Sequence, residues 1–178
     1  MGPSQMPSNE NHSEKQLTEI GRVVRNFASL EWTVKLGIWT MLKVEQKEWE
    51  AITAPLSFKQ ALDSLSSLHK LSHGRGTPRA VTFEELRKRA EDAEASRNEV
   101  IHSVWATSKA SGTLQQVRIT ARAATGIREN LAEGRDISSV GSLHAIAQEI
   151  FETNRALSNY LGLAKGSKLH FEQPQGEG

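Results

Sequence analysis

The chain of 178 residues has no cysteine, which excludes disulfide scaffolds, thiolate zinc sites and cysteine nucleophiles. It has no apolar run near the ~20 residues that a membrane span needs, and Met1 to Asn11 is polar where a secretory signal would be apolar. It also has no large charge excess, because 22 Lys and Arg face 21 Asp and Glu. These absences favour a cytoplasmic protein that does not enter the membrane, and they leave its activity open.

The two ends differ in composition from the rest of the chain. Residues 1–12 are rich in Pro, Ser and Asn, and residues 166–178 contain Gly, Gln and Pro around few apolar side chains. Segments of this kind bury too little apolar surface to offset the cost of ordering, so we expect both to be disordered. The length is that of one domain, and residues 13–165 are predicted to form it.

Apolar residues at spacings of three and four predict helices over residues 13–44, 57–71, 82–104 and 136–164. Ser13 with Gln16 and Thr82 with Glu85 have the spacing of a capping box, and Ser57 is the expected cap of the second helix. The stretch around Trp49 is predicted to be a break between the first two helices. The pattern therefore predicts an all-α fold, most simply an antiparallel helical bundle.

One stretch departs from this helical pattern. Val117, Ile119, Ala121 and Ala123 alternate with polar residues, as in a strand with one polar face. Residues 109–112 have the composition of a turn, so a small β-hairpin is expected directly after the third helix.

Two charged residues fall on predicted apolar stripes. In the first helix, counting from Ile20 through Val24 and Phe27 leads to Glu31, and in the third helix the count leads to Arg97. An unpaired charge inside a bundle costs several kcal/mol, so the two are natural partners for each other. A structural ion pair and a functional site are both compatible with this pattern.

Arg97, Asn98 and His102 form the sequence R-N-x-x-x-H near the predicted end of the third helix. This arrangement resembles the motif of HEPN domains, which are all-helical and carry an Arg, often followed by Asn, four to six residues before a His. The order of a long first helix, a motif helix and a closing helix is also similar. The resemblance covers about residues 13–164, and its specificity rests on these six residues.

The resemblance implies a metal-independent endoribonuclease, commonly a toxin or antiviral-defence effector, in which two copies of the motif meet across a homodimer. It implies that Arg97 and His102 are the catalytic pair and that Asn98 supports them. We add the hypothesis that Glu31 orients the pair.

The chemistry suits these residue types. RNA supplies its own nucleophile in the 2′-OH, so the enzyme needs proton transfer at the 2′-OH and the leaving 5′-oxygen, and cationic donors to phosphate. Histidine transfers protons at neutral pH, and arginine matches phosphate oxygens. The expected products carry 2′,3′-cyclic phosphate and 5′-OH ends.

The near-neutral total hides a basic middle third. Residues 69–135 contain 12 Lys and Arg against 8 Asp and Glu, and no acid lies between Glu99 and Glu129. Four basic residues of this acid-free stretch are the predicted RNA-binding residues: Lys109, Arg118, Arg122 and Arg128. An ordinary solvated strand face remains the alternative.

No cofactor and no metal are expected. His69 and His73 lie four apart without an H-E-x-x-H pattern and are expected to be solvated. RNA, a second copy of the chain and an antitoxin or defence protein are the predicted partners. Two alternatives stay open: a non-catalytic HEPN-like module that binds RNA, nucleotide or protein, and a helical adaptor in which Arg97 and His102 are structural.

Overall fold

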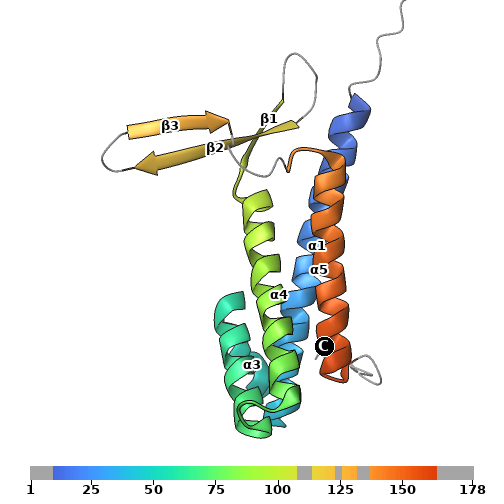
Figure 1. Ribbon diagram of the computed structural model, residues 1–178, viewed down its shortest axis with the longest axis vertical. Helices are drawn as coiled ribbons and strands as arrows, with labels where there is room; N and C mark the ends of the chain where they lie inside the picture. The colour runs from blue at the N-terminus through green and yellow to red at the C-terminus, as the bar shows by residue number, and fades with distance from the viewer. Residues whose placement is uncertain (1–9, 108–113, 123–125, 132–136, 164–178) are drawn as a thin grey trace, which may run out of the picture.

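The computed structural model describes residues 10–107, 114–122, 126–131 and 137–163. The predicted disordered tail 166–178 and residues 1–9 lie outside this range. The described part is mainly helical, as predicted, and consists of α1 (Glu10–Leu42), α2 (Gln46–Thr53), α3 (Phe58–His73), α4 (Pro78–Ile101), β1 (Val104–Thr107), β2 (Leu114–Arg122), β3 (Gly126–Leu131) and α5 (Val140–Tyr160) (Figure 1). No helix in the described part is long and apolar enough to cross a membrane.

The helix caps correct two of the predicted starts. Ser57 caps α3 and forms the capping box with Gln60, as the spacing indicates. The start of α4 at Thr82 was wrong, because Thr77 caps this helix and Pro78 occupies its first turn, where a missing N–H costs nothing. The box of Ser13 with Gln16 was also wrong: α1 already begins at Glu10, so residues 10–12 are helical and not disordered.

The predicted break around Trp49 is a helix. Lys43, with a φ of 53°, ends α1 and turns the chain, and α2 packs on α1 through Trp49, whose indole N–H donates to the carbonyl of Lys35 at 2.7 Å. The short element has only two turns, too few for the apolar period to stand out in the sequence. By returning the chain along α1, it brings Phe58 at the start of α3 to Phe27, with ring centroids 4.8 Å apart.

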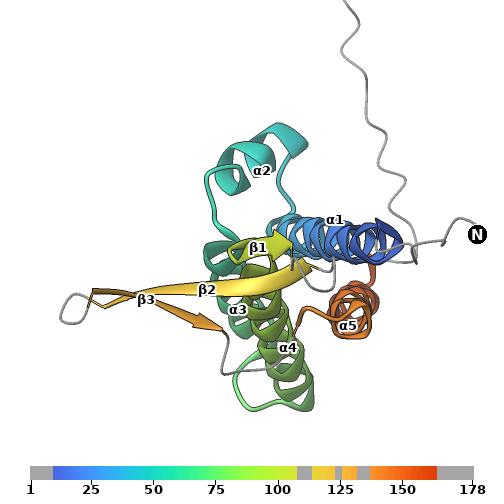
Figure 2. The same cartoon turned by 90° about the horizontal axis from the view of Figure 1, so that it is seen from above.

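The long helices do not form a purely antiparallel bundle. Residue numbers increase in the same direction along α1 and α5. Asn26 donates to the carbonyl of Ala147 at 2.8 Å, and Thr33, further along α1, donates to the side chain of Asn154 at 2.6 Å. These two helices are therefore parallel. α4 is antiparallel to α5, because the Tyr160 hydroxyl at the end of α5 donates to the carbonyl of Arg79 at the start of α4. The views in Figures 1 and 2 show α4 beside both. Only α4 therefore runs against its long neighbours.

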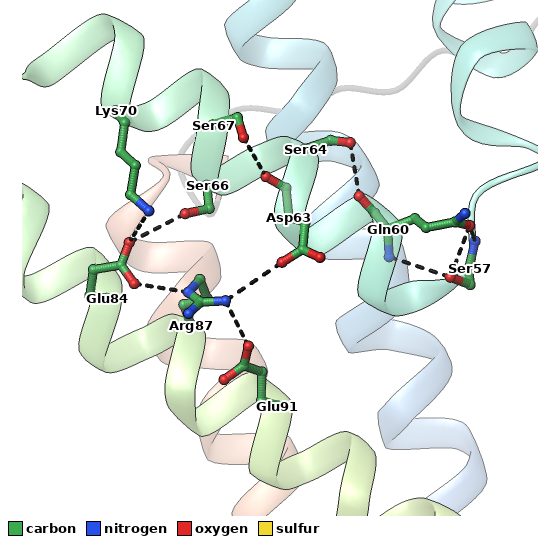
Figure 3. Close-up of polar contacts among 10 residues, drawn as sticks. All are labelled: Ser57, Gln60, Asp63, Ser64, Ser66, Ser67, Lys70, Glu84, Arg87 and Glu91. Carbon is green, nitrogen blue, oxygen red and sulfur yellow. Dashed lines mark hydrogen bonds and ion pairs between the residues drawn. The ribbon is translucent and has the colours of Figure 1, made fainter.

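The interface between α3 and α4 carries a polar network centred on Arg87 (Figure 3). Its guanidinium bonds Glu84 at 2.8 Å and Glu91 at 2.6 Å on its own helix and lies 3.6 Å from Asp63 on α3. Lys70 of α3 contacts Glu84 at 3.0 Å. Burial raises the pKa of Glu84, but the hydrogen bonds from Arg87 and Lys70 outweigh it and hold this pKa below its usual range.

The strands form an antiparallel sheet in the order β1-β2-β3. β1 and β2 pair where the sequence predicts a two-stranded hairpin, and β3 adds a strand that the sequence analysis did not expect; the predicted turn, residues 109–112, lies outside the described residues. The sheet extends sideways from the end of the helices (Figures 1 and 2). Gln16 of α1 anchors it, because its amide donates to the carbonyl of Leu114 and accepts from the N–H of Leu114, both at 3.0 Å. Gln16 also donates to the carbonyl of Ser138, so it joins the sheet to the chain before α5.

Candidate functional site

Arg97 lies on the buried side of α4, as the sequence pattern predicts. The helix buries a stripe around it: Phe83, Leu86, Ala90, Ala93 and Val100. The guanidinium carbon lies 5.2 Å from the centroid of the Phe27 ring on α1, close enough for a cation–π contact. Its Nε is buried and has no hydrogen-bond partner among the described residues.

The predicted partnership between Arg97 and Glu31 is wrong. Glu31 instead pairs with Lys35, one turn along the same helix, at 3.1 Å. The reason lies in the buried stripe of α1, which includes Val23, Leu30 and Ile38, while Val24 is exposed. Glu31 therefore lies beside the stripe rather than on it. In the described part of the chain, no carboxylate lies within ion-pair distance of Arg97.

Asn98 and His102 complete the motif at the end of α4. The Asn98 side-chain oxygen accepts a hydrogen bond from Nη1 of Arg97 at 2.8 Å, and its backbone carbonyl accepts from the N–H of His102 at 3.0 Å. His102 is the C-cap, with φ −91° and ψ 3°, a backbone region in which active-site residues often occur. Its imidazole is exposed and has no ion pair or hydrogen bond within the described ranges. The last turn of α4 thus carries a partly buried cation at Arg97 and an exposed imidazole at its C-cap, His102.

Glu94 is a neighbour that the sequence analysis missed. It precedes Arg97 by one helical turn, and burial raises the pKa of its carboxyl, against the opposing effects of Lys59 and Arg97. Carboxyls that exchange protons in active sites often have a pKa raised in this way. The spacing of three residues before Arg97 was the available signal, because residues three apart on a helix are neighbours.

The sheet register bears on the predicted RNA-binding residues. Antiparallel pairing aligns Thr120 with Arg128 and Arg118 with Asn130, so positions 118, 120, 122 and 128 share one face of the sheet. Val104, two residues after His102, pairs with Val117, the residue before Arg118. The sheet, and with it the face that holds these positions, therefore extends outward from the end of α4. Lys109 lies outside the described residues.

The expectation that His69 is solvated is wrong. Its side chain is 2% exposed and stacks on the ring of Phe83, with centroids 4.3 Å apart and planes at 9°. The cause is its position four residues after Leu65, which puts His69 on the buried face of α3.

No family model, curated protein or solved structure matches this chain. The function is therefore inferred from the residues of the site itself.

Proposed function

We propose that this protein is a HEPN-like, metal-independent endoribonuclease that acts as a toxin or antiviral-defence effector. The observation that carries the proposal is the state of Arg97. This arginine is partly buried, its Nε has no partner among the described residues, and no carboxylate of those residues lies within ion-pair distance of it. A structural arginine in a helical bundle is normally paired. An arginine without an ion pair, on the same helix end as an exposed histidine, is suited to bind a phosphate.

Each motif residue has a distinct role in the proposed reaction. Arg97 binds the scissile phosphate and stabilises the charge that develops on it. Asn98 holds the guanidinium through its 2.8 Å hydrogen bond and so acts as a positioning residue. His102 transfers a proton, either from the attacking 2′-OH or to the leaving 5′-oxygen. The bond between the 2′-oxygen and phosphorus forms as the bond to the 5′-oxygen breaks, which leaves a 2′,3′-cyclic phosphate and a 5′-OH.

A homodimer is part of the proposal because one chain brings only one histidine to the motif. Two proton transfers are needed, one at the 2′-OH and one at the 5′-oxygen. Two copies of His102 related by a twofold axis supply both groups without any further residue type. Glu31 has no part in this mechanism, since its carboxylate forms an ion pair with Lys35.

The RNA backbone is proposed to follow the basic face of the sheet. Positions 118, 122 and 128 lie on this face by register, and the sheet begins two residues after His102. Lys109 belongs to the same acid-free stretch of sequence. Contacts of Lys and Arg to phosphates are independent of sequence and weaken with salt, so these residues add affinity rather than base specificity.

The test is cleavage of RNA by purified protein in EDTA. We expect the wild-type chain to cut and the products to carry cyclic phosphate ends. Arg97→Ala and His102→Ala are each expected to lower the rate by about a hundredfold or more, the usual loss for a proton-transfer or charge-stabilising group. Retention of full activity by both variants would overturn the proposal.

The chain provides a matched control. Arg25 is also followed by an asparagine and donates to its side-chain oxygen at 3.3 Å, but the fifth residue after it is Leu30. Arg25→Ala therefore removes an Arg-Asn pair that has no histidine, and it is expected to leave cleavage unchanged. His144→Ala is the corresponding control for an exposed histidine.

The proposed biological role has a separate test. Expression of the wild-type chain is expected to stop growth, and His102→Ala is expected to be tolerated at the same protein level. If no variant cuts RNA but Arg97→Ala lowers RNA affinity, the chain is the non-catalytic binding module instead.

A further inference from the structure

A groove of about 970 Å³ lies at the far end of α4 from the motif. It is bounded by the end of α3, by the loop with Gly76 and by the first turns of α4. Glu84 at its edge and His102 are 18 residues apart on α4, which is about 27 Å at 1.5 Å per residue. The volume is within the range of small-molecule sites, about 300–1,000 Å³. The groove is therefore separate from the proposed site of RNA cleavage.

His69 belongs to the lining of this groove, and its buried ring carries an acceptor without a partner among the described residues. The carbonyl of Arg79 can only accept, so the Tyr160 hydroxyl donates its single proton there, at 2.8 Å. The contact of 2.7 Å between Nε2 of His69 and the same hydroxyl then requires Nε2 to be the donor. In this tautomer Nδ1 is a lone pair, and it is buried with no hydrogen-bond partner in the described part of the chain. A buried acceptor without a partner costs about 1–3 kcal/mol, so a donor from a ligand would stabilise the site.

The charged groups around the groove favour an anion. Lys70 is paired with Glu84 (Figure 3) and Lys88 with Asp92. Two further arginines line the groove, Arg75 and Arg89; both are exposed, and neither makes an ion pair or hydrogen bond with the described residues. Glu85 is the one acid of the lining without an ion pair to the described residues. The two unpaired arginines and this unpaired glutamate together give the groove a net charge of one positive unit.

The floor of the groove is apolar. Ala80 is buried and Val81 is 53% exposed, and the two belong to the lining on α4. The exposed methyl groups of Val81 offer surface to a flat apolar body. A cation or metal is disfavoured, because the described residues contain no group of three His, Asp or Glu that could hold a metal ion.

We propose that this groove binds a small organic anion with an aromatic body and one N–H or O–H donor. The acidic group of the ligand lies against Arg75 and Arg89, its ring covers Val81, and its donor hydrogen-bonds Nδ1 of His69. The proposal uses no residue of the motif, so it stands or falls independently of the endoribonuclease.

The probe for this chemistry is 1-anilinonaphthalene-8-sulfonate, which combines an aromatic body, an N–H donor and a sulfonate and fluoresces when it leaves water. Titration of the full chain is expected to give saturable binding. The double variant Arg75→Gln with Arg89→Gln, and separately Val81→Asp, are each expected to weaken binding about tenfold, as loss of a charge-assisted contact does. These positions are exposed, so folding is preserved.

Controls of the same kind lie elsewhere. Arg25→Gln with Arg155→Gln removes two exposed arginines outside the groove, and Ile52→Asp changes an apolar residue on α2 that is 47% exposed. Both are expected to bind the probe as the wild type does. Equal binding by all variants, or weakening only in Ile52→Asp, would overturn the proposal.

The proposed hydrogen bond from the ligand to Nδ1 of His69 is tested with naphthalene-1-sulfonate, which has the ring and the sulfonate but no N–H. We expect it to compete more weakly than the anilino probe on the wild-type chain. This difference is expected to shrink in His69→Phe, whose ring keeps the stacking on Phe83. An unchanged difference would exclude His69 as the acceptor.

Discussion

His69 shows how one buried side chain couples folding to proton binding. Burial lowers the pKa of its imidazole, the charges of His73 and Arg79 lower it further, and Glu84 opposes them. The neutral ring is stacked on Phe83 and donates to Tyr160. A proton added to Nδ1 would be a buried charge without a partner among the described groups.

Acid should therefore destabilise the fold through His69. An imidazole in the unfolded chain takes up a proton as the pH falls through about 6.5, whereas the folded chain stays neutral until a lower pH, so the unfolded state gains. We expect the free energy of unfolding in urea to fall between about pH 7.5 and pH 5.5. In His69→Phe the whole curve is lower, because the bond to Tyr160 is lost, but its slope over this range is expected to be smaller. Parallel curves would contradict this account.

At the scale of the helix, two glycines of α1 have opposite surroundings. A Cβ at Gly21 would meet nothing within 4 Å, whereas one at Gly37 would lie 2.8 Å from a methyl group of Leu161 and 3.1 Å from one of Leu65. Gly37 thus lets α1 approach both α5 and α3. Gly21→Ala is expected to raise the free energy of unfolding by about 0.5–1 kcal/mol through helix propensity. Gly37→Leu is expected to lower it by about 1–3 kcal/mol through overpacking; urea denaturation of both variants measures the difference, and equal effects would show that the approach at Gly37 is not tight.

The elements differ in how far the sequence predicts them. Long apolar periods identify α1, α3, α4 and α5, because burial against neighbours imposes the period on the sequence. The short α2 packs mainly through one large side chain, Trp49, and a single residue gives no repeating apolar pattern in the sequence. The predicted stripe of α1 is buried at Phe27, Val34 and Ile38 but was one residue off at Val24 and Glu31, where Val23 and Leu30 are the buried residues. The reason is that apolar residues also lie beside the buried face. Arg97 was placed correctly, since the small residues before it on α4 leave little ambiguity.

At the scale of the molecule, the apolar periodicity of the sequence does not predict the relative directions of the helices or the attachment of the sheet to them. The parallel course of α1 and α5 depends on α2, which returns the chain so that α3 runs with α1. The anchoring of the sheet depends on Gln16 meeting Leu114, 98 residues later. The capping-box spacing assigned Gln16 to a local role, and only the folded chain reveals the distant one.

The proposed homodimer makes a prediction that a monomeric site does not. If two motifs form one site across the twofold axis, a mixed dimer of Arg97→Ala and His102→Ala chains still holds one Arg97 and one His102 in that site. If each chain has its own site, both sites of the mixed dimer lack an essential group. Co-refolding the two inactive variants is therefore expected to restore part of the RNA cleavage, in proportion to the mixed dimers formed. A mixture that stays as inactive as its components, with mixed dimers present by mass spectrometry, would place the whole reaction within one chain and leave the second proton transfer to a group such as Glu94.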